Sequence, residues 1–212
     1  TGEARYLQEA RELADWLLTQ RSDPQAWTFS CWGYHFDWQA RAFFVPAGKP
    51  NIITTCYVAR ALFELGQLTA EQRLIDVALD AARFISARLY TEADGRSFYA
   101  YIPGERAFVH NASLWGAAWC AFAGTQLGDS ALVEQALRVA RQSVQEQAAD
   151  GSWVDGARHH HQFIDGFHTG YNLEALCLLR DATASSEFDA CIRKGYAYYL
   201  NTFFEPDGTA RY

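Results

Sequence analysis

Residues 150–153 read Asp150-Gly151-Ser152-Trp153, and this tight turn with its following aromatic residue decides the fold because it is repeated. Asp-Gly occurs again at residues 94–95 and 207–208, each time with an aromatic residue shortly after it, so the turns lie 56 and 57 residues apart. Asp-Gly is a strong turn signal. A period of about 60 residues that keeps its turn indicates an internal repeat, which has to be identified before any single motif is interpreted.

Two kinds of helical segment alternate between these turns: one is amphipathic, and the other is apolar nearly all round, which indicates burial on every side. The amphipathic segments span about residues 2–20, 70–90, 129–147 and 185–203. The apolar segments span about residues 51–66, 111–127 and 170–181. The apolar helices should therefore form an inner layer. We expect Asn51, Asn111 and Asn172, which are 60 and 61 residues apart, to open them.

Short connections follow the apolar helices, and long connections of about 15 to 30 residues follow the amphipathic ones. Such hairpins form either an α/α toroid, with the long loops at one end, or an open solenoid. The grouping of the long loops favours an all-α fold, an incomplete α/α toroid of about three and a half repeats in a single domain over residues 1–212. Short extended pieces are expected at 98–101 and 153–154. The chain lacks methionine and stops within a repeat, so we expect a fragment truncated at both ends.

The composition argues against several classes of partner. A formal net charge of -7 without a Lys/Arg-rich run argues against nucleic acid. Five cysteines without metal-type spacing indicate a reducing compartment, and therefore a cytoplasmic location. The longest uncharged helical run, residues 112–128, is too short and too rich in Ala and Gly for membrane insertion. No Gly-rich phosphate loop, Walker-type lysine or Ser nucleophile elbow is present, so we expect no cofactor.

The first long loop, residues 27–39, is rich in aromatic side chains, which gain nothing at a surface unless they bury something. We expect Trp32 and Trp38 to offer faces on which sugar rings stack. His35 or Asp37 would then bind sugar hydroxyl groups. The alternative, which the sequence supports equally, is a loop that folds back and plugs the mouth of the ring.

The second long loop brings Tyr101, His110 and Asn111 towards the start of an inner helix. Asn111 is placed to cap that helix by accepting a hydrogen bond from a free backbone N–H, and capping alone would explain it. His110 should point into the mouth and, with Asn111, orient a substrate, although a histidine in this position is more often structural.

The third long loop and the helix after it contain the most polar groups. Asp165 and His168 would form an oriented acid/base pair, for which Tyr171 and Tyr101 are alternates. Tyr171 and Glu174 share a helix face because they are three residues apart. Simpler explanations are that Asp165 caps the helix and that Glu174 is a first-turn acid favoured by the helix dipole. The other substrate-binding candidates here are Trp153, for stacking, and Asn172, for orientation.

Residues 159–161 are three consecutive histidines. Adjacent histidines cannot all face one metal ion, and no further class of ligand accompanies them, so we expect no metal site.

Several strings together carry a family resemblance: residues 32–39, 51–57, 109–117, 150–153 and 163–176. Over nearly its whole length the chain resembles a family of bacterial proteins associated with capsule and exopolysaccharide gene clusters. The resemblance implies an α/α toroid and a polysaccharide context, but no established reaction. Gln145 or Gln147 before residues 150–153 is also similar to the Gln–Trp repeat of terpene cyclases and prenyltransferase β-subunits. Their acidic and zinc motifs are absent, so this likeness supports the fold rather than the chemistry. Toroid glycosidases, polysaccharide lyases and glucuronyl C5-epimerases are closer in expected context.

The leading hypothesis is a carbohydrate-active protein that acts on or binds a polysaccharide or oligosaccharide, for example one containing uronic acid, at the mouth of the toroid. A lyase, an epimerase or a hydrolase would each fit, and a hydrolase would need two carboxylates, for which Asp37 and Asp165 are candidates. The alternatives are a non-catalytic sugar-binding or assembly module and an isoprenoid-handling toroid. A polar cavity lined by Trp, His and Asp would favour sugars.

Overall fold

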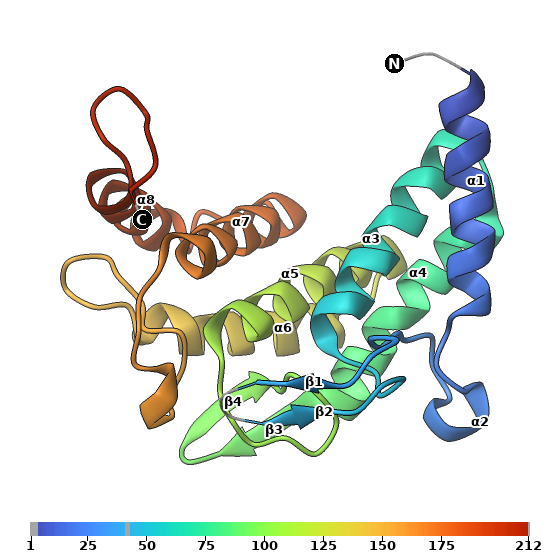
Figure 1. Cartoon of the computed structure of the whole chain (residues 1–212), viewed down its shortest axis with the longest axis horizontal. Helices are drawn as coiled ribbons and strands as arrows, with labels where there is room; N and C mark the ends of the chain where they lie inside the picture. Colours follow the sequence, from blue (N-terminus) through green and yellow to red (C-terminus); the bar gives the residue numbers. More distant parts are fainter. Residues whose placement is uncertain (1–3, 41–42, 212) are drawn as a thin grey trace.

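Helical hairpins follow one another around an arc in the computed structural model, which describes residues 4–40 and 43–211 (Figure 1). The inner helices are α3 (Ile52–Thr69), α5 (His110–Leu127) and α7 (Gly166–Thr183). The outer helices are α1 (Ala4–Thr19), α4 (Gln72–Phe84), α6 (Ser130–Gln145) and α8 (Asp189–Phe203). This arrangement is the predicted α/α toroid, with apolar helices inside and amphipathic helices outside.

Helix α5 lies at the centre of the core. Most of its residues are buried, and it packs against α3, α4, α6 and α7. This helix can be surrounded in this way because it has no Asp, Glu, Lys or Arg side chain that must reach water. The hairpin partners α3 and α4, α5 and α6, and α7 and α8 contact one another in sequence order.

The ends of the inner helices share one backbone conformation. Each inner helix is followed by a residue in the left-handed conformation, at Ala70, Gly128 and Ala184, whose backbone N–H bonds back to the last turn. Gly66 and Gly124 lie one turn earlier, where an added Cβ would come within 2.8 Å of Ile75 and 2.7 Å of Val133 on the outer helix. Glycine there lets the two layers approach closely.

The starts of the inner helices correct the predicted asparagine register. Asn51 caps α3 as expected, with its side chain accepting a hydrogen bond from the Thr54 N–H. The prediction for Asn111 is wrong, because α5 begins at His110 after Val109, which gives no side-chain cap. The structural repeat therefore runs through positions 51, 109 and 165, which precede the three helices.

The prediction for Asn172 is also wrong. Helix α7 begins at Gly166 because Asp165 caps it, accepting a hydrogen bond from the His168 N–H. Asn172 and Glu174 therefore lie within the helix, so Glu174 is not a first-turn acid.

The long loops contain short elements. Two hairpins, β1 (Trp38–Gln39) with β2 (Phe44–Val45) and β3 (Tyr90–Ala93) with β4 (Arg96–Tyr99), are both antiparallel. Asp94 and Gly95 turn the second hairpin with positive φ angles of 52° and 75°. A π-helical turn, η1 (Ile85–Leu89), extends α4, α2 (Pro24–Trp27) is a single turn, and η2 (His159–His161) is a 3₁₀ turn.

The structure corrects the two extended segments expected in these loops. The expected strand at 98–101 is confirmed only for Phe98 and Tyr99, and residues 153–154 form none. Instead, Gly156 makes an isolated bridge to Val109, which ties the third loop to the start of α5.

Within residues 4–40 and 43–211, no helix has the length and apolarity needed to cross a bilayer.

Candidate functional site

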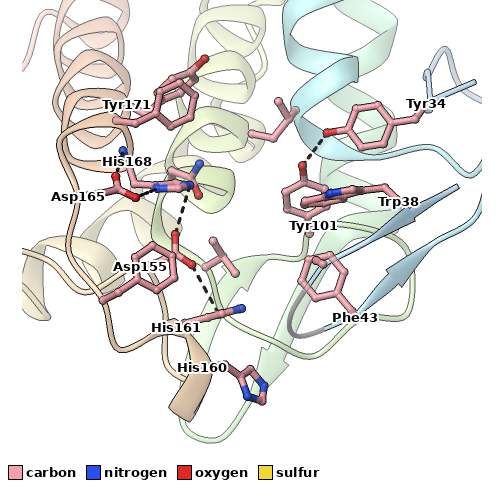
Figure 2. Close-up of a pocket in the computed structure, with 16 residues that line it drawn as sticks. Tyr34, Trp38, Phe43, Tyr101, Asp155, His160, His161, Asp165, His168 and Tyr171 are labelled. Carbon is pink, nitrogen blue, oxygen red and sulfur yellow. Dashed lines mark hydrogen bonds and ion pairs between the residues drawn. The ribbon is translucent and has the colours of Figure 1, made fainter. Parts of the chain in front are cut away.

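The long loops enclose a cavity of about 750 Å³ at the end of the toroid where α3, α5 and α7 begin. Figure 2 shows two facing walls, one largely aromatic and the other rich in carboxylates and imidazoles. The aromatic wall consists of Tyr34, Trp38, Phe43 and Tyr101. The polar wall consists of Asp155, His160, His161, Asp165 and His168, with Tyr171 above them.

The aromatic wall is held together by ring contacts and one hydroxyl pair. The hydroxyl groups of Tyr34 and Tyr101 lie 2.7 Å apart, and the rings of Trp38 and Phe43 lie 5.5 Å and 5.2 Å from that of Tyr101. Burial, together with the nearby Tyr34, raises the pKa of Tyr101. Its hydroxyl therefore stays protonated, and Tyr101 can bind a substrate but cannot serve as a base.

Asp165 and His168 form the pair that their spacing predicts. Asp165 Oδ1 accepts the His168 backbone N–H at 2.7 Å, and Asp165 Oδ2 lies 2.7 Å from His168 Nδ1. Because a carboxylate only accepts hydrogen bonds, Nδ1 carries the proton in this contact and Nε2 is left to face the cavity wall. The cap at the start of α7 thus fixes the orientation of the imidazole.

Asp155 lies on the other side of that imidazole. Its Oδ1 is 3.7 Å from His168 Nε2, and its Oδ2 is 3.9 Å from His161 Nδ1. The side chain is only 9% exposed, and Oδ1 has no hydrogen-bond partner among the residues that the structure describes. Burial raises the pKa of Asp155, the charge of His168 opposes this shift, and Asp165 adds to it. Burial also lowers the pKa of His161.

Tyr171 and Glu174 share a helix face, as expected, but only Tyr171 lines the cavity. Tyr171 accepts a 2.6 Å hydrogen bond from the Tyr57 hydroxyl on α3. Glu174 lies outside the cavity lining, where its Oε1 pairs with Arg60 Nη1 at 3.3 Å. Both residues therefore link α7 to α3, and Tyr171 alone is placed to meet a ligand in the cavity.

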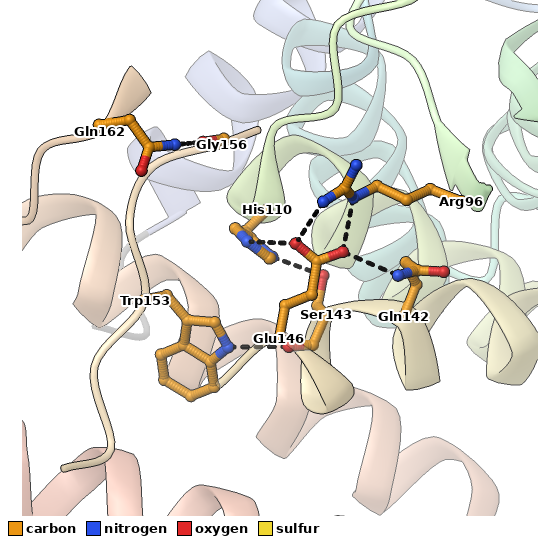
Figure 3. A network of polar contacts seen from close by, with 8 residues as sticks. All are labelled: Arg96, His110, Gln142, Ser143, Glu146, Trp153, Gly156 and Gln162. Carbon is orange, nitrogen blue, oxygen red and sulfur yellow. Dashed lines mark hydrogen bonds and ion pairs between the residues drawn. The ribbon is translucent and has the colours of Figure 1, made fainter. Parts of the chain in front are cut away.

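His110 does not point into the mouth, and that expectation is wrong. It is 1% exposed, its Nδ1 lies 3.0 Å from Ser143 Oγ, and its Nε2 lies 4.0 Å from Glu146 Oε2 (Figure 3). Burial lowers the pKa of His110 to about 4. The charge of Glu146 raises this pKa, and the charge of Arg96 lowers it. His110 is therefore a neutral structural residue that ties α5 to the end of α6.

The same polar network anchors the second hairpin. Arg96 of β4 binds both carboxylate oxygens of Glu146, at 2.6 Å and 3.3 Å, and Gln142 donates a 2.8 Å hydrogen bond to the same group (Figure 3). Partial burial opposes the charge of Glu146, but the hydrogen bonds from Arg96 and Gln142 lower its pKa overall.

Trp32 and Trp153 lie in the core and not in the cavity. Trp32 is 1% exposed and donates its indole N–H to the Leu17 carbonyl. Trp153 is 2% exposed and donates its indole N–H to the Ser143 carbonyl. Neither ring has a free face on which a sugar could stack, so of the three tryptophans only Trp38 is placed for that role.

The remaining candidates are divided between the cavity and its surroundings. His35 and Asp37 are exposed outside the cavity lining, and Asp37 accepts the Ala47 N–H at 2.7 Å, which shapes the first loop. Asn111 lines the cavity, whereas Asn172 is buried and does not belong to the cavity lining. Within residues 4–40 and 43–211, the side-chain oxygens of both asparagines find no hydrogen-bond partner.

Sequence reasoning did not select Asp155, His160 or His161 for this site. Asp155 lies in the third long loop without a local motif, and its place depends on backbone hydrogen bonds to Phe163 and to the distant His110. The sequence raises the histidine tract only as a metal site. In the part of the chain that the structure describes, no group of three or more His, Cys, Asp or Glu is arranged to hold a metal ion.

Comparison with known proteins bears on the fold. No family model matches the sequence, and no curated protein matches it. An unsaturated glucuronyl hydrolase from a Bacillus species, described as responsible for glycosaminoglycan degradation, superposes with a TM-score of 0.72 at 17% identity, covering 97% of this chain and 58% of that one. A possible member of glycoside hydrolase family 105 from Salmonella enterica gives 0.72 at 13% identity, with 99% and 57% coverage.

A polysaccharide lyase matches with a TM-score of 0.59 at 14% identity, covering 76% of this chain and 51% of that one. The chain thus spans about half the length of the solved structures that it matches. At these identities the likeness shows the fold alone, and it confirms the α/α toroid.

Proposed function

We propose that this chain binds a polysaccharide or oligosaccharide in the cavity and acts on it by proton transfer, with Asp165 and His168 as the acid/base pair. The observation that carries the proposal is the pairing of an aromatic wall with a wall of carboxylates and imidazoles across one cavity. Aromatic faces suit sugar rings, and oriented carboxylate–imidazole groups suit proton transfer to or from them.

A uronic-acid-containing polymer is the substrate class that we favour. Structural neighbours of this chain include an unsaturated glucuronyl hydrolase and a polysaccharide lyase, and the resemblance to capsule-associated proteins agrees with such a polymer. Hydrolysis, elimination and epimerisation at C5 all require an acid or a base beside the sugar ring, which the polar wall would supply. A cytoplasmic location remains our expectation.

The test is a screen of the purified protein against polysaccharides with and without uronic acid. New reducing ends would report hydrolysis, unsaturated ends would report elimination, and exchange of the C5 proton would report epimerisation. Asp165→Asn should abolish turnover without unfolding the protein, because asparagine also caps helices well. Undiminished turnover by that variant would sink the assignment.

A non-catalytic sugar-binding or assembly module is the rival, and one observation favours it. Both oxygens of Asp165 already accept hydrogen bonds from His168, as expected of a residue whose task is structural. Binding of an oligosaccharide, measured by calorimetry, without any product in the screen would support this rival. The carboxylates and imidazoles of the cavity argue against an isoprenoid ligand.

A further inference from the structure

The backbone of Asp155 is fixed, whereas its carboxyl group is left free. The Asp155 N–H donates to the Phe163 carbonyl at 2.9 Å, and its carbonyl accepts from the His110 N–H at 3.0 Å. The next residue, Gly156, forms the bridge to Val109. These contacts hold the third loop against the start of α5, so the position of the carboxyl group in the cavity wall is set by the fold.

The carboxyl group itself receives no hydrogen bond from any described residue. Four titratable groups lie near it: His161 of η2, His168 of α7, Asp165, which caps α7, and Tyr101 in the loop after β4, whose pKa the charge of Asp155 raises. A buried carboxylate without a donor is unfavourable, so burial raises the pKa of Asp155 and favours its protonated form.

Asp165 has the opposite surroundings. Its side chain is 41% exposed, it accepts two hydrogen bonds from His168, and it stands at the N-terminus of a long helix. Backbone N–H groups and the helix dipole both stabilise a negative charge in that position. The two carboxyl groups therefore have different tasks: Asp165 caps α7 and orients His168, whereas Asp155 is placed to hold a proton.

We infer that Asp155 is the proton donor of this site and that His168, oriented by Asp165, exchanges protons with it. The inference rests on the proposed function. His168 Nε2 faces Asp155 Oδ1 at 3.7 Å, so a small movement of either side chain closes the contact. Asp155 is therefore a third member of the acid/base group.

Proton transfer from Asp155 accompanies cleavage of the glycosidic bond. When the glycosidic C–O bond breaks, its electron pair stays with the departing oxygen, and the Asp155 proton moves to that oxygen. The leaving group departs as a neutral alcohol, and Asp155 remains as a carboxylate beside His168. In hydrolysis, the water that adds to the sugar carbon returns a proton to this group. In elimination, His168 Nε2 takes the proton from the sugar carbon and then passes it to Asp155, which restores both groups.

The first experiment needs no substrate. Carbon-13 NMR of the whole chain, labelled at aspartate carboxyl carbons, should show one carboxyl group that titrates above the others. That signal should be absent in Asp155→Asn and present in Asp150→Asn, a matched control in the same loop whose Oδ1 accepts hydrogen bonds from Ser152. His168→Gln should move its midpoint further upward, because the charge of His168 opposes the shift. The absence of such a signal would overturn the inference.

The second experiment uses a polysaccharide that is turned over in the screen. Asp155→Asn should lower kcat by about 100-fold or more and remove the alkaline limb of the pH profile, with little change in KM. Asp150→Asn should match the wild type in both. An unchanged kcat and pH profile in Asp155→Asn would overturn the donor role even if the NMR signal is found. If the signal is found but no polysaccharide is turned over, the proposed function fails and the donor role falls with it.

Discussion

Protonation of His110 should destabilise the fold in acid by an amount that the structure allows us to work out. The imidazole is buried against Ser143 and Glu146, and burial lowers its pKa from 6.5 to about 4. Between pH 6.5 and about pH 4, the unfolded chain therefore binds a proton on His110 that the folded protein does not bind. The stability from neutral His110 is fully present above about pH 6.5 and is lost as the pH falls towards 4.

The size of the effect follows from proton linkage. One proton taken up only by the unfolded chain costs about 1.4 kcal/mol for each pH unit, so the whole interval from 6.5 to about 4 amounts to about 3 kcal/mol. That is a large share of the stability of a typical domain. Other groups also titrate in acid, so a variant that lacks only this imidazole is needed to isolate the contribution of His110.

The assay is urea denaturation of wild type and His110→Gln at pH 7, 6, 5 and 4. At pH 7 the variant should be less stable, and the difference in unfolding free energy should shrink by about 3 kcal/mol towards pH 4. Ser143→Ala is the matched control, because it removes the hydrogen bond but keeps the imidazole. It should lose about 1 kcal/mol at pH 7 and keep the wild-type pH dependence. A constant difference between wild type and His110→Gln would refute the reasoning.

Three further outcomes test the packing. Trp153→Ala should lower the unfolding free energy by about 3–5 kcal/mol, because the ring is 2% exposed, whereas Trp38→Ala should cost far less. Equal losses in urea denaturation would contradict the assignment of Trp153 to the core. Ala184→Gly should raise stability by up to about 1 kcal/mol, since Ala184 has a φ of 50° that glycine adopts without strain; a lower Tm would argue otherwise. In a double-mutant cycle, Tyr34→Phe and Tyr101→Phe should each cost about 1 kcal/mol but not add, because they share one hydrogen bond.

The helical layers could be predicted because burial leaves its mark on composition. The segment that forms α5 carries no charged residue from His110 to Leu127, and the segment that forms α6 alternates apolar and polar faces. The start of α7 could not be predicted in the same way. Residues 166–171 contain glycine and mixed polar and aromatic side chains without an apolar period, so the start depends on the competition between two capping residues, Asp165 and Asn172. Helix α7 starts after Asp165 because the Asp165 carboxylate accepts a hydrogen bond from the His168 N–H.

The candidate site also combines a contact that the local sequence predicts with one that it does not. Asp165 and His168 are three residues apart, so their contact is local and follows from the sequence once the helix is assigned. Asp155 lies ten residues earlier, and it reaches His168 only because Phe163 and His110 bind its backbone. Trp153 illustrates the reverse error: an aromatic residue after a turn has the same local sequence whether it lines a cavity or fills a core.

The repeat and the site are connected through one position of the fold. Positions 51, 109 and 165 each precede an inner helix, and at 51 and 165 the side chain caps it. Asn51 is 0% exposed and uses its oxygen for the Thr54 N–H, so its role ends with the helix. Asp165 has a second oxygen that binds His168 Nδ1 and turns that imidazole towards Asp155. A carboxylate in place of an amide thus converts a structural cap into a group that can move protons. Asp165→Asn, which gives position 165 the same side chain as position 51, is therefore the substitution that separates helix capping from proton transfer.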